Sequence, residues 1–211
     1  MKFMEKKIVL KSCNLSKYPD LEIVCKVIEN NLINDYLSTI PESEKFIAVK
    51  TAPVAIRVGK LGEVVHTELY TVIDGKKYLL QEESNTVCER EMPDGSKCND
   101  IVVTNINSTS NENYVVKANK FFGMYTRLSN GLYAPVPEER QIVRVSENII
   151  IKTAWGTEAL CLEGSYIVIY NEKENDFNTL ESGAGDSTYD IKPKFIDNHK
   201  ITTKSKTKNN I

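Results

Sequence analysis

The sequence predicts an α+β protein that is mainly β, with two related small β-rich units and one amphipathic N-terminal helix packed against them. Two observations favour this fold: short segments recur in the same order, and one earlier stretch has helical spacing. The recurring segments are 52–54, 99–103 and 114–117 in the first set, and 134–136, 164–168 and 189–192 in the second. Ordered internal similarity of this kind is typical of a duplicated unit.

Residues 1–45 form the predicted N-terminal segment, with the helix at 19–39. Pro19 suits a first helical turn, and Asp20 and Glu22 place negative charge where the helix dipole favours it. Apolar residues then recur at spacings of three and four until Pro41. They are Leu21, Val24, Ile28, Leu32 and either Tyr36 or Leu37. We expect this stripe to dock on the chain's own sheet, and binding to a partner is the alternative.

The first β-rich repeat is predicted at 46–126, where β-branched and alternating runs predominate. Predicted strands are 7–11 (before the helix), 46–50, 54–58, 64–66, 69–73, 78–80, 101–104 and 114–117. Asp74-Gly75 is a strong hairpin signal because both residues tolerate positive φ. A second hairpin is predicted near Pro93-Asp94-Gly95, 82–86 is a predicted loop, and 118–125 is predicted to form one or two helical turns.

The second β-rich repeat is predicted at 132–197. Its predicted strands are 141–145, 149–153, 159–162 and 166–170. Residues 171–187 are polar and are predicted to be one long loop, and 198–211 is predicted to be a disordered tail because it lacks apolar periodicity.

A turn precedes the central strand of each predicted repeat. Asn99 and Gly164 are residue types that adopt left-handed backbone angles most readily, so we expect both to have positive φ. Asp100 and Ser165 follow them as short hydrogen-bond acceptors. The replacement of Asn-Asp by Gly-Ser therefore preserves one turn geometry.

These segments resemble the PGDYG family, a small bacterial and phage domain named for a Pro-Gly-Asp-Tyr-Gly turn and strand. The resemblance is carried by 153–156, 164–168 and 189–193 with Phe195, and by 99–104 and 114–117 with Phe121. The family's proline is replaced by Glu163 and Cys98, and its aspartate by Ser165 in the second copy. The resemblance implies a tandem, divergent pair of such domains over 52–125 and 134–199. It implies a fold and a bacterial or phage setting, and no reaction.

Composition restricts the function classes. The chain has 211 residues and a net charge of −2, which argues against nucleic-acid binding through bulk charge. No apolar run approaches the roughly 18–20 residues that span a bilayer, so no membrane association is expected. Five cysteines, an odd and dispersed set, predict reduced thiols in a cytoplasmic protein.

The candidate binding residues are mainly aromatic residues and lysines that recur once per repeat. A lysine can meet an anionic group while an aromatic ring stacks on a planar one; the alternative is that the rings are core and the lysines are solvated. The candidates are Tyr114, Lys117, Phe121, Trp155, Tyr166, Tyr189, Lys192 and Phe195. Tyr114, Lys117 and Phe121 are matched with Tyr189, Lys192 and Phe195.

The leading functional hypothesis is a non-enzymatic binding module, a phage-encoded accessory or host-interaction protein that engages a protein or a small anionic ligand. We expect no cofactor, metal or catalytic residue, and homo-oligomerisation stays open. One alternative is a small cytoplasmic hydrolase or nucleotide-modifying enzyme using His66 with a cysteine. His66-Thr67-Glu68 lacks the downstream Pro-Cys-x-x-Cys that zinc deaminases require. The other alternative is a structural phage component.

Overall fold

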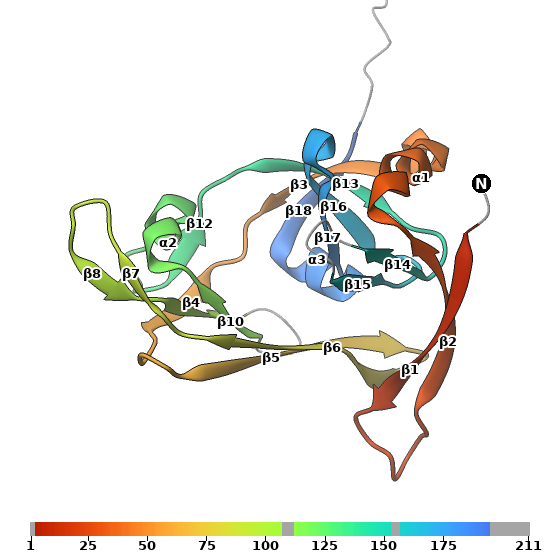
Figure 1. The fold of residues 1–211 in the computed structure, drawn as a ribbon, viewed down its shortest axis with the longest axis horizontal. Coiled ribbons are helices and arrows are strands. Elements are labelled where there is room, and N and C mark those ends of the chain that lie inside the picture. The colour runs from red at the N-terminus through yellow and green to blue at the C-terminus, as the bar shows by residue number, and fades with distance from the viewer. Residues whose placement is uncertain (1–2, 107–111, 153–156, 195–211) are drawn as a thin grey trace, which may run out of the picture.

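A computed structural model describes residues 3–106, 112–152 and 157–194 (Figure 1). Among these residues the fold is mainly β, as predicted, and the strands form three large sheets and one two-stranded ribbon. The predicted tail at 198–211 lies outside the described residues. No helix in these ranges is long and apolar enough to cross a bilayer.

The N-terminal sheet has six strands in the order β15-β14-β2-β1-β6-β5. These strands are β15 (Glu158–Cys161), β14 (Ile149–Lys152), β2 (Leu21–Ile28), β1 (Met4–Ser12), β6 (Lys76–Thr86) and β5 (Val64–Ile73). In Figure 1 the long β5–β6 hairpin runs along the lower side of the molecule and reaches the β1–β2 hairpin. The hairpin turn is at Asp74 and Gly75, which have φ of 50° and 72°, so this prediction is confirmed.

The predicted helix at 19–39 is wrong for its first half. Residues Leu21–Ile28 form strand β2, which pairs with β1 on one side and with β14 on the other. Three of these eight residues are buried, and Val24, placed in the predicted helical stripe, is 48% exposed. This segment is rich in β-branched residues, which favour strands, and two paired neighbours supply its hydrogen bonds.

The helical part of this segment is a 3-10 turn (Asn30–Leu32) followed by α1 (Ile33–Thr39). The helix buries Ile33, Tyr36 and Leu37 in a core shared with strands of two sheets. The short helix therefore docks on the chain's own sheets, but of the predicted apolar stripe it contains only Tyr36 and Leu37.

Two five-stranded sheets form the rest of the molecule. The first sheet has the order β10-β9-β4-β12-β11 and the second sheet β17-β16-β13-β3-β18, and every neighbouring pair in both is antiparallel. The first sheet contains β10 (Asn113–Val116), β9 (Ile101–Asn105), β4 (Val54–Val58), β12 (Tyr133–Pro135) and β11 (Tyr125–Arg127). The second contains β17 (Asp176–Leu180), β16 (Tyr166–Asn171), β13 (Glu139–Arg144), β3 (Lys45–Lys50) and β18 (Tyr189–Pro193).

The two sheets also agree in register. In each sheet the first residue of the second strand (β9 or β16) lies opposite two other residues. One is the last residue of the middle strand (β4 or β13), and the other is the last residue of the adjacent edge strand (β10 or β17). These trios are Ile101, Val58 and Val116 in the first sheet, and Tyr166, Arg144 and Leu180 in the second. A seven-residue helix follows each edge strand: α2 (Ala118–Met124) and α3 (Ser182–Thr188). Each helix leads directly into the opposite edge strand, which begins with a tyrosine.

The fourth strand of each five-stranded sheet comes from the part of the chain that leads into the other sheet. The fourth strand of the first sheet is β12, and that of the second sheet is β3. Strand β3 runs into β4 of the first sheet, yet it pairs with β13 and β18 of the second. Strand β12 runs into β13 of the second sheet, yet it pairs with β4 and β11 of the first. The two sheets are thus completed reciprocally. This pairing crosses the predicted boundaries at 46–126 and 132–197, which stay predictions.

Two predicted loops are wrong. Residues 82–86 continue β6, where the side chains on both faces are exposed while the backbone pairs with β5. Residues 171–187 contain a 3-10 turn (Glu172–Glu174), strand β17 and most of α3. Backbone N–H and C=O groups can pair whether the side chains are polar or apolar. The polar composition of these two segments was therefore not a sufficient reason to predict loops. Lys117, predicted to end a strand, is the residue before α2.

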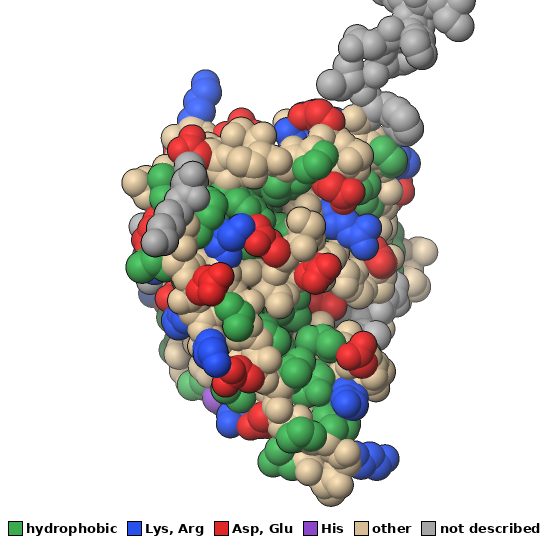
Figure 2. All heavy atoms as spheres, turned by 90° about the vertical axis from the view of Figure 1, so that its right-hand side faces the viewer, with side chains coloured by type: hydrophobic (Ala, Val, Ile, Leu, Met, Phe, Trp, Pro, Cys, Tyr) green, Lys and Arg blue, Asp and Glu red, His purple; other side chains and the backbone are tan. Residues whose placement is uncertain are grey.

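Charged side chains bind the N-terminal sheet together at its surface. Ion pairs join Lys6 to Glu158 at 2.6 Å and Lys26 to Glu147 at 2.5 Å, linking β1 and β2 to the segment around β14 and β15. On the face drawn in Figure 2, basic and acidic side chains are interspersed, and neither sign forms a continuous patch there.

Candidate ligand pocket

A cavity of about 520 Å³ lies between the first and second sheets and is lined by residues of both. Twelve of the lining residues form six pairs, each with one residue from each half of the lining. The two members of a pair occupy equivalent positions, as judged from the strand register and from the positions of α2 and α3. The pairs are Lys50 and Pro135, Asn105 and Tyr170, Tyr114 and Asn178, Val116 and Leu180, Met124 and Thr188, and Tyr125 and Tyr189. The cavity therefore lies where equivalent parts of the two sheets face each other.

Lys50 is the last residue of β3 and contributes a half-buried ammonium group to the cavity wall. Its Nζ donates hydrogen bonds to the hydroxyl oxygens of Tyr114 at 3.1 Å and Tyr125 at 3.2 Å. The two hydroxyls are 3.1 Å apart, and the ammonium nitrogen is 5.5 and 5.7 Å from the two ring centroids. Among the described residues no carboxylate forms an ion pair with Lys50.

Tyr114 and Tyr189, both close to Lys50, stay protonated near neutral pH. Burial, together with Tyr125 and Glu112 nearby, raises the pKa of Tyr114 well above its usual range. Burial raises the pKa of Tyr189 to about 12, with a smaller contribution from Tyr170 and Tyr125. A neutral phenol adds no negative charge, so the positive charge of Lys50 is solvated by dipoles and ring faces.

Tyr189 and Tyr125 occupy equivalent positions but have different surroundings. The Tyr125 ring is stacked on Phe121 with centroids 4.9 Å apart, and its hydroxyl accepts from Lys50. Tyr189 is half-buried and lies directly opposite Lys50 in the β18–β3 pairing. Within the described part of the chain its hydroxyl has no hydrogen-bond partner and its ring has no aromatic contact.

The other charges around the cavity are engaged by protein groups. Arg140 donates to Glu138 Oε2 at 2.5 Å, and its guanidinium carbon lies 4.5 Å from the Tyr170 ring centroid. Asn105 Nδ2 donates to Glu112 Oε2 at 2.9 Å. Lys50 is thus the lining cation whose hydrogen bonds go to neutral side chains.

The predicted binding residues lie in different parts of the structure, and only some of them line the cavity. Tyr114 and Tyr189 line the cavity. Phe121 and Tyr166 are buried in two separate core clusters, the second against Phe46 with centroids 6.1 Å apart.

The remaining candidates do not line the cavity or cannot be placed. Lys117 and Lys192 are exposed and outside the cavity lining, and Lys192 forms an ion pair with Asp190 at 2.7 Å. Trp155 and Phe195 lie outside the described residues.

The predicted matching of the two sets needs correction. The strand pairing equates Tyr125, and not Tyr114, with Tyr189, and it equates Tyr114 with Asn178. Lys50, Tyr125 and Arg140 were not among the predicted binding residues. Tyr125 was included in the segment 118–125 that was predicted to be helical, whereas it begins β11 directly after α2, as Tyr189 begins β18 directly after α3.

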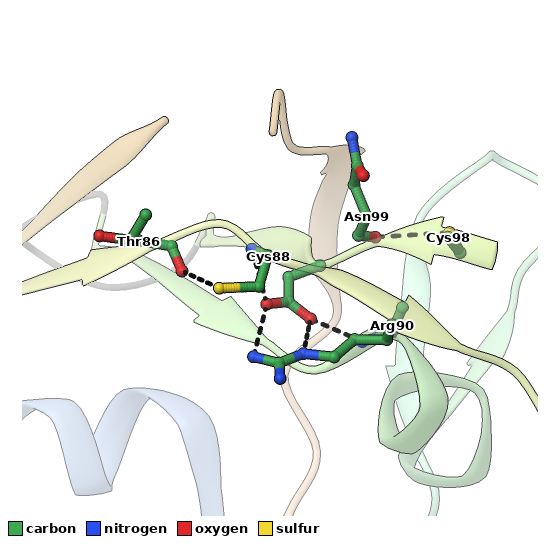
Figure 3. A network of polar contacts seen from close by, with 7 residues as sticks. Thr86, Cys88, Arg90, Cys98 and Asn99 are labelled. Atoms are coloured by element: carbon green, nitrogen blue, oxygen red, sulfur yellow. Dashed lines mark hydrogen bonds and ion pairs between the residues drawn. The ribbon is translucent and has the colours of Figure 1, made fainter. Parts of the chain in front are cut away.

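A buried carboxylate, Asp100, anchors the helix that leads into Tyr125. Figure 3 shows Cys88 and Arg90, two of the residues that donate hydrogen bonds to it. Arg90 donates to it from Nε at 2.9 Å and from Nη2 at 3.1 Å, and the backbone N–H groups of Cys88 and Ala118 donate at 3.1 and 3.3 Å. Burial alone raises the pKa of Asp100, but these hydrogen bonds outweigh it and the pKa is lowered. The carboxylate thereby joins the β7 (Glu89–Glu91) ribbon strand to the start of α2.

The predicted left-handed backbone conformation is confirmed at Gly164 and is wrong at Asn99. Gly164 has φ of +83°, whereas Asn99 ends strand β8 (Lys97–Asn99) without positive φ. The Asn99 side chain instead donates to the carbonyl of Gly59 at 3.0 Å.

The residues of the alternative enzyme hypothesis lie elsewhere. His66 stands on the exposed face of β5, where Nδ1 is 2.9 Å from Ser84 Oγ. All five cysteines are free, and Cys98 lies opposite Arg90 in the β7–β8 ribbon, not opposite Cys88. Within the described residues, no group of three or more His, Cys, Asp or Glu side chains is arranged to hold a metal ion.

Comparisons of the chain with protein-family models, with curated proteins and with solved structures find no match in any of the three.

Proposed function

We propose that this chain is a non-enzymatic binding module that holds a small anionic ligand in the cavity between its two five-stranded sheets. The observation that carries the proposal is Lys50: a half-buried ammonium group in a cavity wall, bonded to two tyrosine hydroxyl groups. Buried charges in proteins are normally paired, and Lys50 is partly buried with no ion-pair partner among the described residues. An anion entering the cavity would supply the opposite charge at a place where the hydrogen-bonding groups are already positioned.

We further infer that the two sheets descend from one duplicated unit, as the recurring segments predict. Matching strand order, matching register and seven-residue helices at the same place support this inference. The reciprocal exchange of β3 and β12 supports it too, because such an exchange is expected when two copies of one unit first associate and later become one chain. The cavity then lies between equivalent parts of the two copies.

Titration of the full chain with simple anions tests the proposed function. Acetate, benzoate and inorganic phosphate are added separately, and tyrosine ring signals are followed by NMR. We expect saturable shifts of the Tyr114 and Tyr125 signals with at least one of these anions. Lys50→Met should weaken that binding at least tenfold, since it removes a charge-assisted hydrogen bond.

Lys192→Met is the matched control, because it removes the same charge from an exposed position on β18. It should leave the binding unchanged. Binding that is equally strong in the Lys50→Met and Lys192→Met variants, or no saturable shift with any of the three anions, would contradict the proposal.

The other hypotheses stay predictions. The resemblance to the PGDYG family, the phage-encoded accessory or structural role, and an enzyme using His66 with a cysteine each lack a supporting contact among the described residues. A small anionic ligand is favoured over a protein partner because the candidate contacts converge inside a cavity.

A further inference from the structure

We infer that the ligand is a planar aromatic monoanion, bound with its acid group at Lys50 and its ring against Tyr189. This inference rests on the proposed function and adds the ligand class. It follows from the charges that line the cavity, from the position of Tyr189, and from the size of the cavity.

The charges indicate a single negative charge on the ligand. The cavity lining contains two basic side chains, Lys50 and Arg140, and two acidic ones, Glu112 and Glu138. Arg140 is already paired with Glu138. A dianion at Lys50 would gain one cation and would approach two carboxylates in the same cavity, where like charges repel more strongly than in bulk water.

The position of Tyr189 indicates a planar body on the ligand. Because Tyr189 lies directly opposite Lys50 in the β18–β3 pairing, the two Cβ atoms are about 4.5–5.5 Å apart and both side chains stand on one face. Tyr189 is therefore the strand neighbour of Lys50 on this face, although the Lys50 ammonium itself contacts Tyr114 and Tyr125. We expect the body of a ligand whose acid group is bound at the ammonium to reach the Tyr189 ring. Tyrosine rings bind planar π-systems in offset-stacked or edge-to-face arrangements.

The comparison with Tyr125 shows why Tyr189 is the available ring. Tyr125 stands at the equivalent position, but its ring is stacked on Phe121 and its hydroxyl is bonded to Lys50. Tyr189 has neither kind of partner within the described residues. Its pKa of about 12 keeps the hydroxyl protonated, so it can also donate a hydrogen bond to a ligand acceptor.

The cavity is large enough for such a ligand. Its volume of about 520 Å³ lies within the range of roughly 300–1,000 Å³ that is typical of small-molecule sites. Acetate or phosphate would occupy a small part of it. A bicyclic aromatic acid fills more of the space and reaches apolar lining residues such as Val116 and Leu180.

Four probes separate the ligand's charge from its planarity in calorimetric titrations of the full chain. They are naphthalene-2-carboxylate, its fully saturated analogue decahydronaphthalene-2-carboxylate, the neutral naphthalene-2-carboxamide, and inorganic phosphate. We expect naphthalene-2-carboxylate to bind at least tenfold more tightly than each of the other three. Tyr189→Leu should reduce its affinity about tenfold, and Lys50→Met by tenfold or more.

Two further variants guard against a folding artefact. Tyr189→Phe keeps the ring and should retain most of the affinity, and Lys192→Met should bind like the unchanged protein. If the saturated acid or phosphate binds as tightly as naphthalene-2-carboxylate, or if Tyr189→Leu binds it normally, the aromatic-monoanion inference is overturned while the proposed anion site stands. If none of the anionic probes binds, the proposed function itself fails.

Discussion

Asp100 and Ser165 directly precede the second strands of the two five-stranded sheets, β9 and β16. The two residues form equivalent backbone hydrogen bonds but differ in their side chains. The carbonyl of Asp100 accepts from Gly59 N at 2.9 Å, and the carbonyl of Ser165 accepts from Val145 N at 2.9 Å. Both residues are nearly inaccessible, at 1% and 3% exposure. One side chain is a carboxylate bonded to Arg90, and the other is a hydroxyl.

The helices that follow are secured by different means. The first N–H of α2 donates to Asp100, a residue far from it in sequence, while Lys117 before the helix provides no side-chain cap. Helix α3 is capped locally by Glu181, whose side chain accepts from Ala184 N at 2.9 Å. The comparison teaches that the backbone register is the shared feature, and that side chains can stabilise one geometry through long-range or local contacts.

Replacing Asp100 should have the largest effect on stability. Asp100→Ala leaves Arg90 and two backbone N–H groups without their acceptor, and we expect a loss of about 3 kcal/mol in the free energy of unfolding. Glu181→Ala should cost about 1 kcal/mol, as for loss of a helix cap, and Ser165→Ala about 1 kcal/mol or less. Urea denaturation measures all three. Equal losses for Asp100→Ala and Ser165→Ala would break the comparison.

The pH dependence of stability should sharpen the role of Asp100. Its pKa is lowered in the folded state, so its contribution is present above the unfolded pKa of about 3.9 and is lost as pH falls through the folded pKa. The difference in unfolding free energy between the unchanged protein and Asp100→Asn should therefore be constant near neutral pH and shrink below about pH 4. Exposed carboxylates are common to both proteins and cancel. A difference that grows on acidification would contradict this.

Backbone substitutions should separate the two turns. Gly164→Ala places a Cβ on a residue with φ of +83°, and we expect a cost of about 1–2 kcal/mol. Asn99→Gly should not stabilise the protein, because Asn99 is not left-handed and loses its bond to Gly59; a cost of about 1 kcal/mol is expected. Denaturation midpoints test both, and stabilisation by Asn99→Gly would contradict the absence of a left-handed backbone conformation at Asn99.

Removing the hydroxyl groups of Tyr125 and Tyr189 should have the smallest effects on stability, with the larger loss at Tyr125. Tyr125→Phe removes an acceptor for Lys50 and should cost about 1 kcal/mol. Tyr189→Phe removes a hydroxyl that has no hydrogen-bond partner among the described residues, and it should change stability by less than about 0.5 kcal/mol. Thermal unfolding of the two variants side by side provides the measurement. Equal costs would remove the argument that Tyr189 is available to a ligand.

Local sequence patterns predicted many elements but failed where two periods fit the same residues. Leu21–Ile28 fits a helical spacing and also alternates as a strand, and pairing with β1 and β14 decided in favour of the strand. In the candidate site, the predicted binding residues Tyr114 and Tyr189 line the cavity, and their role in binding stays a prediction. Their predicted matching was wrong, because it compared residue types without the register that equates Tyr125 with Tyr189.

Features that depend on neighbouring residues were predictable from local patterns: the hairpin at Asp74 and Gly75, the short helix after Lys117, and the recurrence of segments in one order. The pairing of β3 and β12 with strands of the other sheet, and the position of Lys50 among tyrosines from other strands, depend on the folded chain as a whole. The physical reason is that strand pairing uses backbone groups that are alike in every residue but proline. Which strands meet is therefore decided by packing over the whole chain, and the side chains that meet in the cavity are decided with them.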